Sequence, residues 1–496
     1  MSVAPARGGL AAVLLLAAGA VLYRLPEREV WFDEAVTVTY ARLPWPVLWH
    51  AAGKMDAFFT PYYALMHLWT DAFGTSELAV RVPSLLGNLL AVAAVYALGC
   101  ALASPRAGLL AAAVSALNPF FVALARDARP HPFLAAFGAL CSLAFVEALR
   151  RESRRWWLAY GALALLGAWL DLFLLLVPLA HAVYALLFDR RIAWRDFLAA
   201  CAGAALLCVP LVAAVARNPG HRTWIGPLTP STVLGTFGHF AGNRVALACA
   251  VVVIGWALVL RRRRPATVLG PVPRAPFAFL LTWLVVPVLA LGAASLAMPI
   301  YLDRYLAEAY PAAALLIGLS LAMVPWPAAA LAACVLLAAD VRGLADAYAE
   351  VPDGMRGTVA YLESEVRPGD AVVVQPAGAY STFAYYDERL GEPDLSAVMA
   401  APHPATYRVW GRRAAEPAEL RAIARGHRRV WLVLETLAPH DPESEPHLRQ
   451  VEAVFAENGA PRLRRRVPHA TTLLFVRSDG IRAGPAAANH RRLGRS

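Results

Sequence analysis

Charge is scarce in this 496-residue chain: 16% of the residues are Asp, Glu, Lys or Arg, whereas 59% are hydrophobic. A soluble fold of this length cannot bury that much apolar surface, so the excess must face something other than water. Apolar runs at 10–23, 278–298 and 312–324 approach the roughly 20 residues that cross a bilayer core. The sequence therefore predicts a polytopic α-helical membrane protein.

Cysteine is scarce too, and it follows no ligand pattern. The six cysteines lie in apolar stretches, and none forms a Cys-x-x-Cys pair or has histidines at ligand spacing. This argues against a disulfide framework or a zinc site. The net charge of +11 does not indicate a nucleic-acid partner, because the arginines are dispersed in short clusters between apolar runs.

The apolar runs, separated by charged breaks, predict about eleven membrane spans. A pair of short spans meets at Asp171. The predicted spans lie near 9–23, 84–103, 107–125, 131–149, 156–171, 172–188, 197–215, 245–260, 277–297, 308–324 and 327–340.

Arginine clusters at 150–155, 190–195 and 261–274 fall on alternate loops, which predicts that those loops are cytoplasmic. The opposite parity places outside the first loop (24–83), the turn at 126–130, the loops 216–244 and 298–307, and everything after 341. The expected location is the cytoplasmic (inner) membrane, with multiple passes. A cleaved signal peptide is the alternative for the first span, because small residues at 17–20 resemble a cleavage site. Both interpretations leave the first loop outside.

After the last span the composition changes to that of a small soluble α/β domain. Alternating runs at 371–374, 430–434 and 472–476 predict strands, and amphipathic stretches near 355–366, 416–425 and 446–458 predict helices. The predicted division is a membrane domain over 1–340, an extracytoplasmic α/β domain over 341–480 and a disordered tail over 481–496.

Two adjacent carboxylates, Asp33 and Glu34, follow the first span by about ten residues. Ionised pairs just above a bilayer are seldom there for packing, although Asp33 could instead cap a helix that begins at Glu34 or Ala35. The same loop holds Lys54, the only lysine in the chain, whose compact ammonium would suit a phosphate. Its alternative is a solvated lysine retained by chance.

Two further external segments concentrate charge. The turn between the third and fourth spans contains Asp127 and Arg129, and the late loop contains Asp303, Arg304 and Tyr305. An arginine or an aromatic residue at a span end is often only an interfacial anchor. An acid flanked by arginines in so short a turn favours a functional interpretation.

Taken in order, these segments resemble the GT-C superfamily of membrane glycosyltransferases. The resemblance is to the dolichyl-phosphate-mannose protein mannosyltransferase and aminoarabinose transferase branch, and it covers about 9–340. It rests on Asp-Glu in the first loop, Pro-x-Tyr at 61–63, Gly-x-Ser-Glu-x-x-x-Arg-x-Pro-Ser at 74–84, Asn-Pro-Phe at 118–120 with the acid-Ala-Arg turn, and Asp-Arg-Tyr-Leu at 303–306. The chain departs from that pattern at Phe58-Phe59-Thr60 and at Pro130-His131-Pro132.

The resemblance implies transfer of a sugar from a polyprenyl-phosphate donor to a lipid, glycan or protein acceptor. By motif position Asp33 is the expected general base, and Glu34 supports it or orients the acceptor. The expected donor-binding residues include cations for the departing phosphate and Asp127, which would hold Arg129 or contact the sugar. The full expected binding set is Lys54, Asp56, Tyr62, Tyr63, Asp127, Arg129, Arg304 and Tyr305.

No organic cofactor is expected, and a divalent metal is left open because some branches of the superfamily use one. A transporter or flippase is the alternative from another class, but the sequence has no internal repeat of the kind that many transporters carry. An inert membrane scaffold whose C-terminal domain binds a partner is a third interpretation. The transferase interpretation is favoured, because a lipid-linked donor needs an apolar groove between membrane spans and this explains why the chain is so deeply embedded.

Overall fold

The computed structural model divides the chain into two compact units, 1–351 and 352–496, which are described separately. The boundary follows a helix, α16 (Trp326–Tyr348), that runs beyond the end predicted for the last span. The structure describes residues 4–55, 57–189, 192–217, 225–263, 275–349, 354–376, 379–390, 417–435, 444–457, 459–468 and 470–477.

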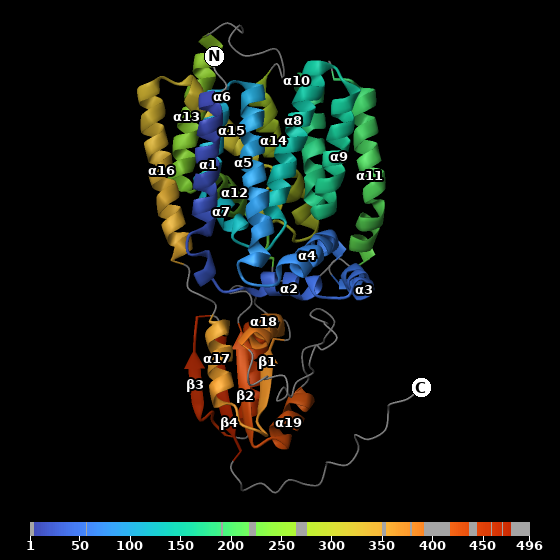
Figure 1. Cartoon of the computed structure of the whole chain (residues 1–496), viewed down its shortest axis with the longest axis vertical. Coiled ribbons are helices and arrows are strands. Elements are labelled where there is room, and N and C mark those ends of the chain that lie inside the picture. The colour runs from blue at the N-terminus through green and yellow to red at the C-terminus, as the bar shows by residue number, and fades with distance from the viewer. Residues whose placement is uncertain are drawn as a thin grey trace. The chain divides into compact units, whose positions relative to one another are not determined.

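The first unit is a helical bundle (Figure 1). Within its described residues seven segments are long and apolar enough to cross a membrane. They contain α1 (Ala4–Leu22), α5 (Val82–Leu102), α8 (His131–Arg151), α11 (Trp194–Arg217), α13 (Arg244–Arg263), α14 (Pro276–Ala297) and α16. The predicted polytopic fold is confirmed.

The other four predicted spans are helical but short or broken. Between α6 (Pro105–Leu117) and α7 (Pro119–Ala125) the chain bends by 65° at Asn118, whose side chain accepts from the backbone N–H of Phe121 and caps the second helix. The remaining three are α9 (Arg154–Leu170), the η4–α10 segment (Leu172–Leu175 and Leu176–Phe188) and α15 (Tyr310–Met323). The expected number of eleven is therefore reached only by counting these shorter elements.

Small residues allow the central helices to approach closely. A Cβ on Gly318 of α15 would lie 2.4 Å from the backbone nitrogen of Ala111 on α6, and one on Gly99 of α5 would lie 2.5 Å from the Cα of Gly108. Such contacts between backbones are typical of membrane helices, which gain little from hydrophobicity when they associate in lipid. The close packing holds α15 at the centre of the bundle, where most of its side chains are buried.

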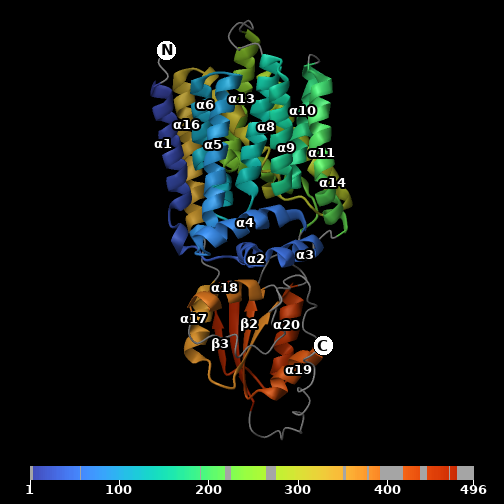
Figure 2. The ribbon, with the colours of Figure 1, turned by 45° about the vertical axis from the view of Figure 1, so that its right-hand side comes forward.

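The first loop is largely helical and lies across one end of the bundle (Figures 1 and 2). After a short turn η1 (Leu25–Glu27) come α2 (Phe32–Ala41), α3 (Trp45–Met55), η2 (Ala57–Phe59), α4 (Thr60–Phe73) and η3 (Ala79–Arg81). Tyr40 of α2 stacks on Tyr63 of α4 with ring centroids 4.5 Å apart. This packing holds the helices of the first loop together.

The second unit contains a four-stranded sheet in the order β1-β2-β4-β3. Strand β1 (Ala371–Gln375) is parallel to β2 (Arg429–Glu435), and β4 (Ala470–Val476) is antiparallel to both β2 and β3 (Leu463–Arg466). The three strands predicted from alternation are confirmed. The basic edge strand β3 was not predicted, because its Leu-Arg-Arg-Arg sequence has almost no alternation of apolar and polar residues.

Helices cover both faces of this sheet (Figure 2). The predicted helices are confirmed as α17 (Met355–Glu365), α19 (Pro417–Gly426) and α20 (Ser444–Ala456); α18 (Tyr380–Leu390) was missed. Leu420, Val451 and Phe455 pack against one face of the strands, and Tyr361 meets Trp431 on the other. The tail predicted at 481–496 lies outside the described residues.

Candidate active site

The two first-loop carboxylates lie in the first turn of α2, and their side chains have different surroundings. The helix begins at Phe32, and Glu34, as its third residue, accepts from the backbone N–H of Trp31 at 3.3 Å. This is half of a capping box, so the N-terminal capping predicted for Asp33 belongs to Glu34. The Asp33 carboxylate is left to face other loops.

Glu34 forms a fully buried ion pair with Arg81, at the junction of η3 and α5. The Arg81 Nε and Nη2 donate to its two carboxylate oxygens at 2.7 and 2.6 Å. Burial would raise the pKa of the Glu34 carboxyl, but the adjacent Arg81 guanidinium outweighs burial and lowers that pKa below its ordinary value. Arg81 also donates to the carbonyls of Leu25, Arg28 and Glu29. Glu34, expected to support the base or orient the acceptor, ties the loop to the bundle.

The second external turn is bound to the same network. Glu34 Oε1 accepts from the backbone N–H of Ala128 at 2.9 Å, and Asp127 Oδ1 accepts from Arg28 Nη1 at 2.5 Å. Asp127 was expected to hold Arg129 or contact the sugar; the partner that the structure gives it is Arg28. Burial raises the pKa of Asp127, and Arg28 offsets that only in part. Two loops far apart in the sequence are thereby fixed together.

Asp33 lies between two arginines from different loops. Its Oδ2 is 3.5 Å from Arg129 Nη2 and 3.5 Å from Arg304 Nη1. These separations are at the long end of hydrogen-bonding range, and no described residue donates a hydrogen bond to Asp33 Oδ2. The Arg129 backbone is anchored because its carbonyl accepts from Ser84 Oγ at 2.8 Å. The predicted base and two predicted phosphate-binding cations therefore converge.

From Arg129 the contacts pass through two rings to a second carboxylate. The Arg129 guanidinium lies 4.2 Å from the centroid of the Phe59 ring, and that ring meets His131 edge-on at 6.4 Å. His131 Nδ1 is 3.8 Å from Asp171 Oδ2. The η2 turn, the start of α8 and the end of α9 are thereby brought together.

From Asp171 the contacts return to Asp33. Asp171 Oδ1 accepts from the backbone N–H of Phe173 at 3.0 Å, and the Phe173 ring stacks on Tyr305 at 4.9 Å and 21°. Arg304 lies 5.8 Å from the Tyr305 ring and closes the circuit through its pair with Asp33. We call Asp33, Arg129, Phe59, His131, Asp171, Phe173, Tyr305 and Arg304 the contact ring.

The Arg304 backbone is bonded to the side chain of the preceding residue, Asp303. Asp303, which begins η6 (Asp303–Leu306), accepts from the backbone N–H of Arg304 at 2.7 Å through Oδ1, and its Oδ2 lies 2.5 Å from His239 Nδ1. His239 is on α12 (Pro230–Ala241). Its hydrogen bond to Asp303 raises the pKa of His239. Burial would raise the pKa of Asp303, but the hydrogen bond from His239 outweighs it and lowers that pKa.

Five of the eight expected binding residues are not in the contact ring: Asp127, which pairs with Arg28, and four residues of the first loop. Tyr62 and Tyr63 are fully buried in α4, where Tyr63 packs against Tyr40 instead of being exposed to a substrate. Asp56 lies outside the described residues, and Lys54 is described only as part of α3. Their proposed contacts with substrate stay predictions.

Several residues of the site were not predicted from the sequence. Arg81 was visible as a charge at the start of an apolar run, and Asp171 as a carboxylate between two short spans; both are the type of residue that marks a functional or buried polar site in membrane proteins. His131 was noted only as a departure from the family pattern. Arg28 and His239 carry no sequence signal that separates them from interfacial anchors.

The residues at this site do not fit a divalent metal ion. Among the described residues, the charged neighbours of Asp33 within ion-pair distance are two guanidiniums, which cannot ligate a cation. Across the described part of the chain no three His, Cys, Asp or Glu side chains are grouped to hold a metal.

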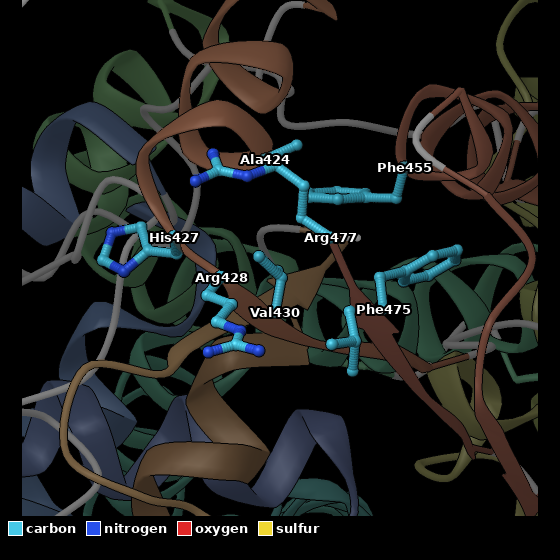
Figure 3. Close-up of a pocket in the computed structure, with 8 residues that line it drawn as sticks. Ala424, His427, Arg428, Val430, Phe455, Phe475 and Arg477 are labelled. Atoms are coloured by element: carbon cyan, nitrogen blue, oxygen red, sulfur yellow. The ribbon is translucent and has the colours of Figure 1, made fainter. Parts of the chain in front are cut away.

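A pocket in the second unit is lined by arginines but by no carboxylate that could accept a proton. Figure 3 shows Arg428 and Arg477 near an apolar floor that includes Val430, Phe455 and Phe475. Its other lining residues are Ala424, His427 and Val476, so no carboxylate is among the eight. The contact ring of the first unit is the better candidate for catalysis.

Part of the first unit matches a known protein family. The family described as dolichyl-phosphate-mannose-protein mannosyltransferase matches residues 60–217, which include Arg129, His131 and Asp171. No curated relative matches the chain.

Solved structures match over nearly the whole length. ArnT from Cupriavidus metallidurans in the apo state has a TM-score of 0.65 at 13% identity, covering 95% of this chain and 98% of that one. The same protein bound to undecaprenyl phosphate gives 0.58 at 14%, covering 97% and 99%. The Archaeoglobus fulgidus oligosaccharyltransferase in the apo form gives 0.52 at 11%, covering 87% and 69%. The chain therefore shares the fold of these proteins, as the resemblance stated from the sequence predicted.

Proposed function

We propose that this chain is a membrane glycosyltransferase that moves a sugar from a polyprenyl-phosphate donor to an acceptor hydroxyl or amine, with Asp33 as general base. The observation that carries the proposal is the position of Asp33 between Arg129 and Arg304. In this arrangement Asp33 can accept a proton, and the two guanidiniums can stabilise negative charge that develops on a leaving phosphate.

The cations beside Asp33 favour an anionic substrate. Asp33 Oδ2 lies 3.5 Å from a guanidinium nitrogen of both Arg129 and Arg304, so two fixed cations meet at the proposed base. Guanidiniums suit the geometry of phosphate oxygens, and a phosphate that enters beside these two arginines would be held by both.

The proposed reaction is a displacement at the anomeric carbon. The acceptor oxygen or nitrogen forms a bond to that carbon while the bond from the carbon to the phosphate oxygen breaks, and the polyprenyl phosphate leaves with the electron pair. Asp33 Oδ2 accepts the proton that the acceptor loses. The arginines stabilise the charge that collects on the leaving phosphate more in the transition state than in the ground state.

The direction of α8 supports the membrane orientation that we propose. The helix begins at His131, a member of the contact ring, and ends at Arg150 and Arg151 after 21 residues, about 30 Å further on. The positive-inside rule assigns the arginine-rich end to the cytoplasm. We therefore place the contact ring at the extracytoplasmic surface of the cytoplasmic membrane.

A polyprenyl chain is the proposed lipid because the fold provides membrane-embedded helices beside the ring. ArnT, which is similar to this chain over nearly its whole length, has been solved with undecaprenyl phosphate bound. The matched family is described by a dolichyl-phosphate sugar. Both are polyprenyl phosphates, which supports the same donor class here.

The test is sugar transfer in membranes that contain equal amounts of wild type or Asp33→Asn protein. A panel of radiolabelled polyprenyl-phosphate hexoses and pentoses is supplied as donors, with a broad acceptor extract. General-base catalysis contributes about 10²- to 10⁴-fold, so the variant should lose transfer by that factor. Asp71→Asn is the matched control, because Asp71 is an exposed carboxylate on α4 that pairs with His67.

Loss of transfer in Asp33→Asn with full activity in Asp71→Asn is the expected result. Equal transfer by wild type and Asp33→Asn would remove Asp33 from the chemistry. If wild-type membranes transfer sugar from none of the donors, the transferase proposal itself is wrong.

A further inference from the structure

Three buried titratable residues, of which His131 and Asp171 belong to the contact ring, have no role in the proposed proton transfer. No described residue forms a hydrogen bond with either ring nitrogen of His131, with Asp171 Oδ2 or with either carboxylate oxygen of Glu308. His131 and Glu308 are 1% and 0% exposed, and Asp171 is 0% exposed. Buried polar groups are nearly always paired, so this cluster is incomplete without a ligand.

Asp171 has one satisfied oxygen and one open oxygen. Its Oδ1 caps η4 through the backbone N–H of Phe173, which fixes the carboxylate plane. Its Oδ2 lies 3.8 Å from His131 Nδ1, too far for a hydrogen bond. An ionised carboxylate can only accept hydrogen bonds, so a partner of Oδ2 must present an O–H or N–H group.

Glu308 adds a further buried carboxyl beside α8. Its backbone carbonyl lies 2.6 Å from the point where a Cβ on Gly138 of α8 would be, so only glycine lets this segment pack so closely against α8. Gly138 follows His131 by seven residues, about two turns of the same helix. Asp171 Oδ2 and both Glu308 carboxyl oxygens lack a hydrogen bond from the described residues, which favours a ligand that carries several hydrogen-bonding groups.

The side chains of the contact ring differ in solvent exposure, which defines an open side and a deep side of the site. The Asp33 and Arg304 side chains are 16% and 22% exposed, whereas those of His131 and Asp171 are 2% and 1% exposed. Phe173 and Tyr305, which stack on each other, lie between the two sides. The deep side is polar at Asp171 and aromatic at its flank, a combination that suits a sugar ring with hydroxyls and C–H faces.

We propose that Asp171, with His131 and Glu308, forms a subsite that binds the hydroxyl groups of the sugar to be transferred and so selects the donor. The inference rests on the proposed transferase function. The acceptor is assigned to the open side, because it must reach Asp33 and must leave again with the sugar attached. The sugar is assigned to the deep side, where its remote hydroxyls reach Asp171 while its anomeric carbon stays near Asp33 and the arginines.

Equilibrium binding tests the subsite separately from transfer. The full-length protein in lipid nanodiscs is titrated with two probes, a polyprenyl-phosphate sugar that the wild type accepts or binds, and the same polyprenyl phosphate without sugar. The measured quantity is the ratio of the two affinities. A hydrogen bond to a charged group is worth about 10- to 100-fold in binding, so Asp171→Asn should lower the ratio by about that factor.

The substitution is matched to the geometry. Asparagine retains an oxygen that can cap η4 and replaces the open acceptor with a donor, and Asp171→Ser retains a capping oxygen while it removes the open one. Asp340→Asn is the control, because Asp340 is a buried carboxylate on α16 whose Oδ1 also lacks a hydrogen bond from the described residues. Its affinity ratio should equal that of the wild type.

The outcomes separate the two proposals. A lower ratio in both Asp171 variants, with unchanged affinity for the lipid without sugar, supports the subsite. An unchanged ratio, or an equal loss of affinity for both probes, overturns it. If Asp33→Asn abolishes transfer while the Asp171 variants keep the wild-type affinity ratio, the subsite proposal is wrong and the transferase proposal stands. If no sugar-bearing lipid binds more tightly than the lipid without sugar, the subsite proposal is wrong whatever the transfer assay gives.

Discussion

The buried ion pair between Glu34 and Arg81 gives the sharpest stability prediction. Both side chains are 0% exposed, and the two hydrogen bonds between them are 2.6 and 2.7 Å long. Glu34→Gln removes the negative charge and turns an N–H group towards the guanidinium. Breaking a buried pair in this way costs about 3–5 kcal/mol, because an uncompensated charge stays buried.

A double-mutant cycle isolates the pair from its backbone contacts. Arg81→Met leaves the Glu34 carboxylate buried and also leaves the carbonyls of Leu25, Arg28 and Glu29 without their donor. The double variant removes both charges, so its loss should be smaller than the sum of the two single losses. The expected coupling is about 1–3 kcal/mol, within the range measured for residues in direct contact.

The assay is unfolding of the purified protein in mixed micelles by a denaturing detergent, followed by near-ultraviolet circular dichroism. Free energies of unfolding are compared for wild type, both single variants and the double variant. Single losses that add to within about 0.5 kcal/mol would refute the assigned coupling. A Glu34→Gln protein as stable as the wild type would refute the burial argument itself.

Three further predictions concern the late loop and the bundle. Arg304→Gln should slow single-turnover transfer by about 10²- to 10³-fold, the loss typical when one stabilising donor is removed, and an unchanged rate would take Arg304 out of the reaction. The hydrogen bond to Asp303 raises the pKa of His239, so the ion pair between the two is fully present below pH 6.5 and is lost as the pH rises through the raised pKa. Wild-type transfer should therefore fall as the pH rises through that pKa. The His239→Phe protein should be slower at every pH and should not show this fall. Gly318→Leu would force a side chain into the backbone of Ala111 and should destabilise the bundle by about 1–3 kcal/mol or more in the same detergent titration, and wild-type stability would contradict the close packing.

Local patterns predicted the elements well where periodicity and composition were strong. The long apolar runs became α5, α8, α11, α13 and α14, and the alternating runs became β1, β2 and β4. Apolar length was a poorer guide at the broken helices. An Asn-Pro pair bends the chain between α6 and α7, which were predicted as one span. The break at Asp171, whose cap starts a new turn after α9, was predicted.

The sequence by itself determined that this chain enters a membrane, that an α/β unit follows, and that Asp33 lies in a loop with the family's order of motifs, because composition and motif order are local properties of the chain. Only the tertiary structure decided that Glu34 is buried against Arg81 while Asp33, one residue away, faces Arg129 and Arg304. Neighbouring residues on a helix point about 100° apart, so adjacent carboxylates in the sequence meet different surroundings. The partners come from loops 47 to 271 residues further along the chain, and which of them approach is decided by how the helices pack.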